Sequence, residues 1–77
     1  MEKKLFKLVK SSLKIKSIVN LKSSDKNIEE WDSLGHLSII SALDKASKGK
    51  TSKISSLANA NSVIKILEIL KKNKISI

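Results

Sequence analysis

The sequence predicts a small all-α protein, a bundle of three to four helices that forms a single domain over residues 1–77. The chain has no Pro, only two Gly and only two aromatic residues, a composition that disfavours a turn-rich β-sandwich. Apolar residues recur at helical spacing in three separate stretches. Residues that commonly begin helices stand directly before the second and third of these stretches.

The first stretch predicts an amphipathic helix over about residues 2–17. Its apolar residues lie on one side and its lysines largely on the other, with Glu2 near the positive end of the helix dipole. The apolar side consists of Leu5, Leu8, Val9 and Leu13. Residues 20–27 (NLKSSDKN) are a cluster of turn formers and predict a loop. Together with the IEEW that follows, they make a long polar connection.

The second helix is expected to begin at Asp32 or Ser33, because Asp is a preferred N-cap and complements the helix dipole. Apolar residues run from there to Ala46, and their broad distribution predicts a central helix that is touched from several sides. Residues 47–53 (SKGKTSK) end this helix. Gly49 is expected to be the first residue beyond it, in the left-handed conformation.

The last third of the chain predicts a short helical segment and a closing helix. Residues 54–60 are too few for more than one or two turns. Asn61 or Ser62 is expected to cap the closing helix, which has lysines at its negative end. One apolar stripe faces the core and consists of Val63, Ile66, Leu67 and Leu70.

The charge of the chain is uneven. Its formal net charge is +9, and all sixteen basic residues are Lys. Residues 27–47 nevertheless carry a net charge of −3. An excess of positive charge is compatible with a basic module that binds nucleic acid or an anionic membrane. The absence of Arg and the shortage of aromatic residues argue against nucleic acid, so no nucleic-acid partner is expected.

The acidic segment contains one distinctive serine. Among fourteen serines, only Ser33 has an N-capping Asp before it and a long apolar helix after it. The first turn of a helix offers unpaired N–H groups, which would favour an anionic group esterified to the hydroxyl. Gly35 is expected to leave room for a modifying enzyme to approach. The simplest alternative is that Asp32 and Ser33 only begin a helix.

A second alternative is a hydrolase triad made of Ser33, His36 and Asp32. We disfavour it because Asp32 is better used as the helix cap and the sequence has no G-x-S-x-G elbow. His36 is instead expected to face solvent. No catalytic residue and no metal ligand is predicted, so the chain is not expected to be an enzyme.

The segment WDSLGHLSIISALDKA resembles the attachment site of acyl carrier proteins, and NSVIKILEIL is similar to their closing helix. The order of elements agrees over essentially the whole chain. The resemblance implies an acyl-carrier-protein type of bundle with a long loop between helices one and two. It also implies a 4′-phosphopantetheine arm, derived from coenzyme A, on Ser33 beside Asp32, Leu34 and Gly35. The arm would carry an acyl or aminoacyl cargo as a thioester.

The resemblance further implies a phosphopantetheinyl transferase as a partner, together with an acyl or aminoacyl ligase, synthase or transferase. Five residues are expected to take part in partner recognition: Glu29, Glu30, Trp31, Leu37 and Asp44. For Trp31 the other interpretation is a hydrophobic staple that packs back onto the helix. Leu34 and Leu37 are likewise compatible with core positions that border a crevice for the cargo.

Some positions depart from the pattern of carriers in fatty-acid synthesis. Ser38 and Lys45 stand where acidic residues are common, and Ser47 and Thr51 occupy the neighbourhood of a customary Phe and aliphatic residue. These departures predict a carrier of a specialised pathway. With no Cys, no apolar run of the roughly 20 residues that a membrane span needs and no signal-peptide pattern, we expect a cytoplasmic monomer without a membrane span.

Overall fold

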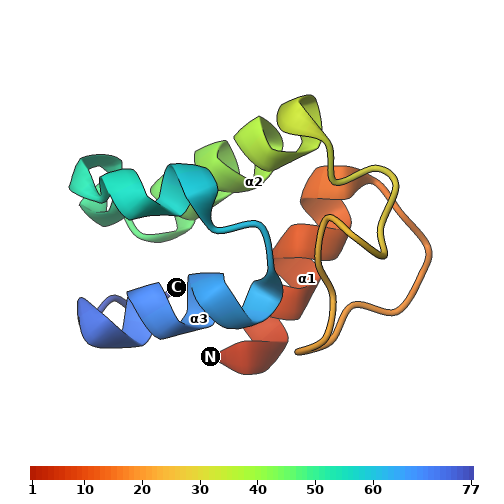
Figure 1. Ribbon diagram of the computed structural model, residues 1–77. Coiled ribbons are helices and arrows are strands. Elements are labelled where there is room, and N and C mark those ends of the chain that lie inside the picture. The colour runs from red at the N-terminus through yellow and green to blue at the C-terminus, as the bar shows by residue number, and fades with distance from the viewer.

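The computed structural model describes all 77 residues, and it is all-helical (Figure 1). Its elements are α1 (Glu2–Leu13), α2 (Ser33–Ala46), the 3₁₀-helices η1 (Lys50–Lys53) and η2 (Ser55–Asn59), and α3 (Val63–Lys72). The all-α prediction is therefore confirmed. So are the predicted starts of α2 and α3, which follow directly on their capping residues Asp32 and Ser62. None of these helices combines the length and the apolar character that a membrane span requires.

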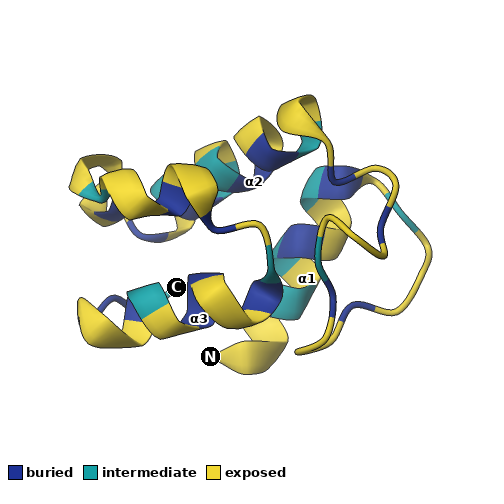
Figure 2. Cartoon of the chain, in the orientation of Figure 1, coloured by how far each residue is buried: buried dark blue, intermediate teal, exposed yellow.

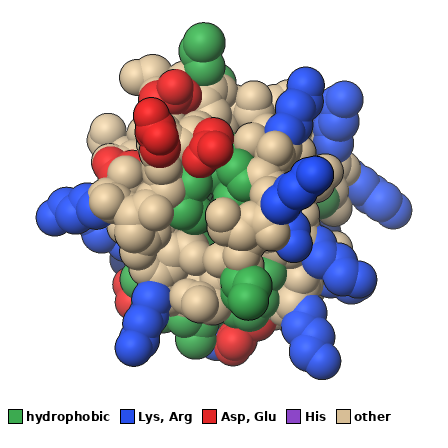
Figure 3. Space-filling model, turned by 90° about the vertical axis from the view of Figure 1, so that its right-hand side faces the viewer, with side chains coloured by type: hydrophobic (Ala, Val, Ile, Leu, Met, Phe, Trp, Pro, Cys, Tyr) green, Lys and Arg blue, Asp and Glu red, His purple; other side chains and the backbone are tan.

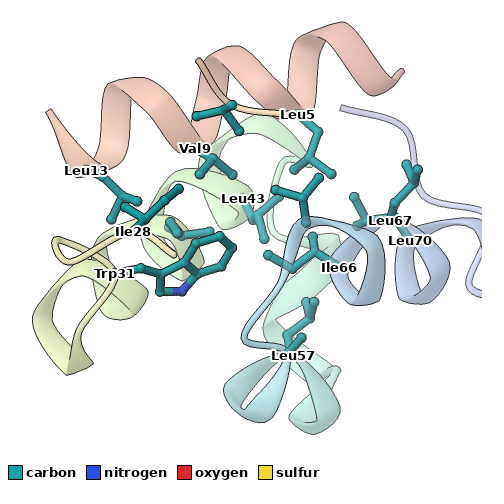
Figure 4. Packing of buried hydrophobic residues seen from close by; sticks show 14 of the residues in the cluster. Leu5, Val9, Leu13, Ile28, Trp31, Leu43, Leu57, Ile66, Leu67 and Leu70 are labelled. Atoms are coloured by element: carbon teal, nitrogen blue, oxygen red, sulfur yellow. The ribbon is translucent and has the colours of Figure 1, made fainter. Parts of the chain in front are cut away.

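The helices surround one core. α1 packs against both α2 and α3, and η2 contacts α2 and α3 as well (Figure 1). Figure 4 shows apolar side chains from all of these elements pointing toward one another. The most deeply buried among them include Leu5, Ile39, Leu43, Ile66 and Leu70. The predicted apolar stripe of α3 is confirmed, because all four of its residues are buried.

α2 contacts three elements, α1, η1 and η2, in agreement with the prediction that it is touched from several sides, but only one of its faces is buried. Its buried residues are His36, Ile39 and Leu43, which form a single stripe (Figure 2). Leu34 and Leu37 are 75% and 63% exposed. The reason is that α1, η1 and η2 are the neighbours of α2, and they leave its remaining surface uncovered.

Residues 14–32, between α1 and α2, form no helix. This connection is fixed by buried side chains and by backbone hydrogen bonds to the start of α3. The Val63 N–H donates to the Ser23 carbonyl at 3.0 Å, and the Asp25 N–H donates to the Asn61 carbonyl at 3.0 Å. These contacts fix the position of the connection and, with it, the position of the start of α2.

All three α-helices end in the same way, with a lysine in the left-handed conformation. The φ angles are 55° at Lys14, 57° at Lys48 and 55° at Lys74. In each case the following N–H donates to the carbonyl five residues earlier, at 3.3, 2.8 and 2.9 Å respectively. This arrangement is a Schellman motif, in which Gly usually holds the left-handed position.

The motif corrects two predictions. α1 ends at Leu13 and not near residue 17, because Lys14 turns the backbone out of the helix. At the end of α2, the first residue beyond the cap is Lys48, and the predicted Gly49 lies one position further along. Gly49 also has a positive φ of 85°.

Replacing Lys14 with Gly should stabilise the protein. The left-handed conformation costs an L-residue roughly 1–2 kcal/mol, and the extra entropy lost by Gly offsets about 0.5–1 kcal/mol of this. We expect Lys14→Gly to raise the free energy of unfolding by about 0.5–1 kcal/mol in urea denaturation. Lys10→Gly, which removes the same charge from the interior of α1, should instead lower it by about 1 kcal/mol. Equal effects of the two variants would contradict this explanation.

Candidate functional site

The first turn of α2 displays Ser33. Asp32 precedes it with extended backbone, and its Oδ1 accepts a hydrogen bond from the Gly35 N–H at 2.8 Å. The Asp32 carbonyl accepts the first helical hydrogen bond, from the His36 N–H at 2.8 Å. The N–H groups of Ser33 and Leu34 have no acceptor in the protein. The Ser33 side chain is exposed, so an anion on its oxygen would lie near two free donors at the positive end of the helix.

Ser33 also borders the largest groove of the molecule, which has a volume of about 1030 Å³. The groove runs between α2 and the segment that contains η1 and η2. The α2 side contributes Ser33, Leu37, Ser41 and Asp44, and the opposite side includes Ile54. A group attached to Ser33 would therefore have a groove beside it.

His36 forms part of the floor of this groove, and the expectation that it faces solvent is wrong. The residue is only 9% exposed. Its Nδ1 lies 3.0 Å from the Trp31 Nε1, and its Nε2 lies 2.8 Å from the Leu57 carbonyl oxygen. An indole N–H can only donate and a carbonyl can only accept, so Nδ1 is the acceptor and Nε2 carries the proton. His36 thus links two segments, the connection that precedes α2 and the 3₁₀-helix η2.

Trp31 is the partner of His36 in this arrangement. It is 3% exposed, and its ring is nearly parallel to the imidazole, with an interplanar angle of 18° and a centroid distance of 6.2 Å. Figure 4 shows the indole among the core side chains, near Ile28. The staple-like interpretation, in which Trp31 packs back onto the helix, agrees with this placement. The indole is not exposed to serve as an anchor for a partner, which corrects its assignment to the recognition surface.

The same contacts exclude the hydrolase triad. A general base must be able to take a proton from the nucleophile. Both ring nitrogens of His36 are already engaged, with Trp31 and Leu57, and neither is paired with Ser33. No group of three or more His, Cys, Asp or Glu side chains is placed to hold a metal ion.

Gly35 has a different role from the one predicted. A Cβ on this residue would lie 2.2 Å from the Glu30 carbonyl oxygen and 2.8 Å from the Leu13 Cδ2. The space left by the missing side chain is therefore filled by the connection and by α1, and not by an approaching enzyme. Gly35 allows the backbone before Ser33 to pack directly against α2.

Leu34 and Leu37 form an exposed apolar surface beside Ser33. Both also line a second, shallower hollow, which includes Ser38 and Lys45. Contiguous exposed apolar surface of this kind can contribute to contact with another molecule. Their exposure overturns the interpretation of these two residues as core positions.

The predicted acidic residues lie on either side of this surface. Glu29 and Glu30 are exposed at the end of the connection, directly before α2. Figure 3 shows acidic side chains gathered on one part of the face formed by the connection, with lysines bordering the other side. Asp44 lies three turns along α2 and lines the groove. Its Oδ1 is shielded from solvent and has no hydrogen-bond partner.

The structure thus brings Ser33, Asp32, Leu34 and Leu37 together at the start of α2, with Asp44 at the far end of the groove. It also identifies His36 as the residue that holds the groove floor, a role that sequence reasoning missed. Searches of protein-family models, of curated proteins and of solved structures found no match to this chain.

Proposed function

We propose that this chain is a carrier protein of the acyl-carrier type, in which Ser33 bears a 4′-phosphopantetheine arm. The observation that carries the proposal is the display of Ser33. Its side chain is exposed in the first turn of α2, beside two free N–H groups and at the edge of the largest groove. A serine that only began a helix would require neither the groove nor the exposed apolar surface next to it.

Attachment of the arm is a phosphoryl transfer from coenzyme A. The Ser33 Oγ attacks the phosphorus that carries the pantetheine group, and a Ser–O–P bond forms. The pyrophosphate P–O bond breaks, adenosine 3′,5′-bisphosphate leaves, and the hydroxyl proton passes to a base of the transferase. A separate phosphopantetheinyl transferase with its own Mg²⁺ supplies the catalysis. On this chain, Asp32 fixes the helix start while the Ser33 and Leu34 amides face the new phosphodiester.

The cargo would be held as a thioester on the terminal thiol of the arm, and the chain itself would perform no catalysis. Partner enzymes, namely a ligase, synthase or transferase, would dock on the surface around Ser33. Leu34 and Leu37 offer apolar contact, and Glu29 and Glu30 offer charge to a basic patch on the partner. Asp44 is the only acidic residue of α2. A helix with so little negative charge suits a specialised set of partners.

Mass spectrometry after incubation with coenzyme A and a broad-specificity transferase tests the proposal. We expect one phosphopantetheine adduct on the wild-type chain, mapped to Ser33 by peptide fragmentation. Ser33→Ala should remain unmodified. Ser38→Ala is the matched control, because Ser38 is also exposed on α2, and it should be modified like the wild type. Absence of an adduct on the folded wild-type chain would refute the proposal.

A second candidate is a basic module for anionic surfaces, favoured by one observation. Lys48, Lys50, Lys53 and Lys74 line a single hollow, and no acidic residue lines it with them. This hypothesis predicts that the protein is retained on DNA or anionic vesicles in a salt-dependent manner. Ser33→Ala should leave this retention unchanged, and Lys→Gln changes should weaken it. Retention of this kind, without an adduct on Ser33, would favour it over the carrier.

A further inference from the structure

Lysines gather at one end of the bundle, where the chain that follows α2 meets the end of α3. Four of them line a single hollow, and no acidic residue lines it with them. Two more lie in the last turn of α3. All six residues are exposed. We call this set the basic end, and it consists of Lys48, Lys50, Lys53, Lys71, Lys72 and Lys74.

The helix dipoles account for only part of this gathering. Lysines at the carboxyl end of a helix are favourable, but the effect fades beyond the last turn. α2 ends at Ala46, whereas Lys50 and Lys53 lie beyond that turn, in η1. Both line the same hollow as Lys74, which comes from the other end of the segment. Like charges brought together in this way repel one another, so the stability of the fold does not explain their placement.

The basic end and Ser33 lie at opposite ends of α2. Ser33 is the first residue of the helix and Lys48 follows its last turn, a separation of roughly 20 Å at the helical rise per residue. Figure 1 shows η1 and the end of α3 on its left-hand side, with the start of α2 on the other side. The exposed residues Glu29, Glu30 and Asp32 directly precede Ser33. A negatively charged surface that attracts the basic end would therefore turn Ser33 away from it.

The chemistry of the basic end favours a membrane over nucleic acid or a folded protein. The chain has no Arg to pair bidentately with phosphates and bases, and neither of its aromatic residues lines the hollow for stacking. Its apolar lining residues, Ile54 and Ile75, are half-buried and buried, so they offer no anchor to a protein partner. The headgroups of an anionic bilayer require neither feature. Each lysine near such a surface strengthens binding roughly fivefold.

We propose that the basic end docks the protein on an anionic phospholipid membrane, with the start of α2 turned away from the lipid. The contact is electrostatic and reversible, and no segment of the chain enters the bilayer. This inference goes beyond the carrier function and does not require it, because the two surfaces are separate. In a carrier, the orientation keeps Ser33 accessible to soluble enzymes while the cargo is held near the membrane.

Cosedimentation with lipid vesicles tests the proposal. The wild-type chain with a bare Ser33 is mixed with vesicles of phosphatidylglycerol and phosphatidylcholine, or with vesicles of phosphatidylcholine alone. We expect binding to the anionic vesicles to be at least about tenfold tighter than binding to the neutral ones, and to weaken steeply as salt is added. A DNA duplex at the same salt concentration serves as the nucleic-acid comparison and should bind more weakly.

Two quadruple variants locate the contact, because they remove equal charge from different surfaces. The first changes the lysines of the hollow: Lys48→Gln, Lys50→Gln, Lys53→Gln and Lys74→Gln. The control changes exposed lysines that do not line it: Lys7→Gln, Lys10→Gln, Lys14→Gln and Lys16→Gln. The first variant should bind anionic vesicles at least about tenfold more weakly than the wild type, and the control should stay within about threefold. The lipid comparison on the wild-type chain stands even if one variant fails to fold.

The outcomes separate this inference from the carrier function. Absence of binding to anionic vesicles, equal losses in the two variants, or tighter binding to DNA would overturn the membrane assignment, whether or not Ser33 accepts an arm. A chain that binds the vesicles but accepts no arm would refute the carrier alone. Loading of Ser33 on vesicle-bound protein tests the orientation and should proceed at the rate seen in solution. A block of loading on the vesicles would overturn the orientation.

Discussion

His36→Phe should lower the free energy of unfolding by about 3 kcal/mol, since each buried polar group left without a partner costs roughly 1–3 kcal/mol. The substitution removes the acceptor of the Trp31 indole N–H and the donor to the Leu57 carbonyl at once. Both partner residues are buried, so water cannot replace these bonds. For a domain of this size, the loss corresponds to a decrease of roughly 12–24 °C in Tm by thermal denaturation.

A double-mutant cycle with Trp31→Phe separates the hydrogen bond from the loss of packing. In the double variant the indole N–H no longer exists, so His36→Phe leaves only the Leu57 carbonyl unpaired. We expect the effect of His36→Phe to be smaller by about 1 kcal/mol in the Trp31→Phe background. Strictly additive effects, or a His36→Phe variant as stable as the wild type, would show that His36 does not join the connection to η2.

Gly35→Ala should also destabilise the protein, against the usual preference of helices for Ala. The new Cβ would meet the backbone carbonyl of Glu30 at 2.2 Å, so either the connection or α2 must move. Because the clash is with a backbone atom, we expect it to cost about 2–3 kcal/mol, the upper part of the range for overpacking, which exceeds the roughly 1 kcal/mol gained in helix propensity. We expect the free energy of unfolding in urea to fall by about 1–2 kcal/mol.

Ser38→Ala is a suitable control, because Ser38 lies one turn further along α2 and is exposed. It tests the gain in helix propensity without a new contact, and it should change stability by no more than about 0.5 kcal/mol. A Gly35→Ala variant more stable than the wild type would show that the connection does not pack against α2 as described.

The sequence was sufficient to predict the elements whose signals are local. Asp32 and Ser62 are preferred N-caps directly before apolar periodic stretches, and both accept the predicted hydrogen bonds. The core stripe of α3 followed from 3.6-residue periodicity alone. The placement of Ser33 in the first turn of α2 followed from the same capping signal.

Features that depend on tertiary contacts could not be predicted in the same way. A lysine has no intrinsic preference for the left-handed conformation, so Lys14 and Lys48 gave no sign that they end their helices. The burial of His36 depends on the Leu57 carbonyl, from a segment far along the chain. Which side of α2 is buried depends on where α1 and η2 pack. Apolar content alone therefore left Leu34 and Leu37 compatible with core positions, although both are exposed.

The buried Ser47 and Thr51 form another such feature. The Thr51 N–H donates to the Ser47 Oγ at 3.2 Å, and the two hydroxyl oxygens lie 3.4 Å apart. These polar side chains are satisfied by each other and by nearby backbone, which explains how they occupy a position where an aromatic residue would have been expected. Their pairing depends on the geometry of the turn between α2 and η1, so the sequence pattern alone could not predict it.

The backbone hydrogen bonds that join residues 23–25 to residues 61–63 bear on the order in which the molecule assembles. They connect opposite halves of the chain, so their formation must await closure of the large intervening segment and repay its entropy. The segment that sets the position of Ser33 should accordingly become ordered late, after the helices that enclose it. A nascent chain would display Ser33 in its final position only when the last helix has docked.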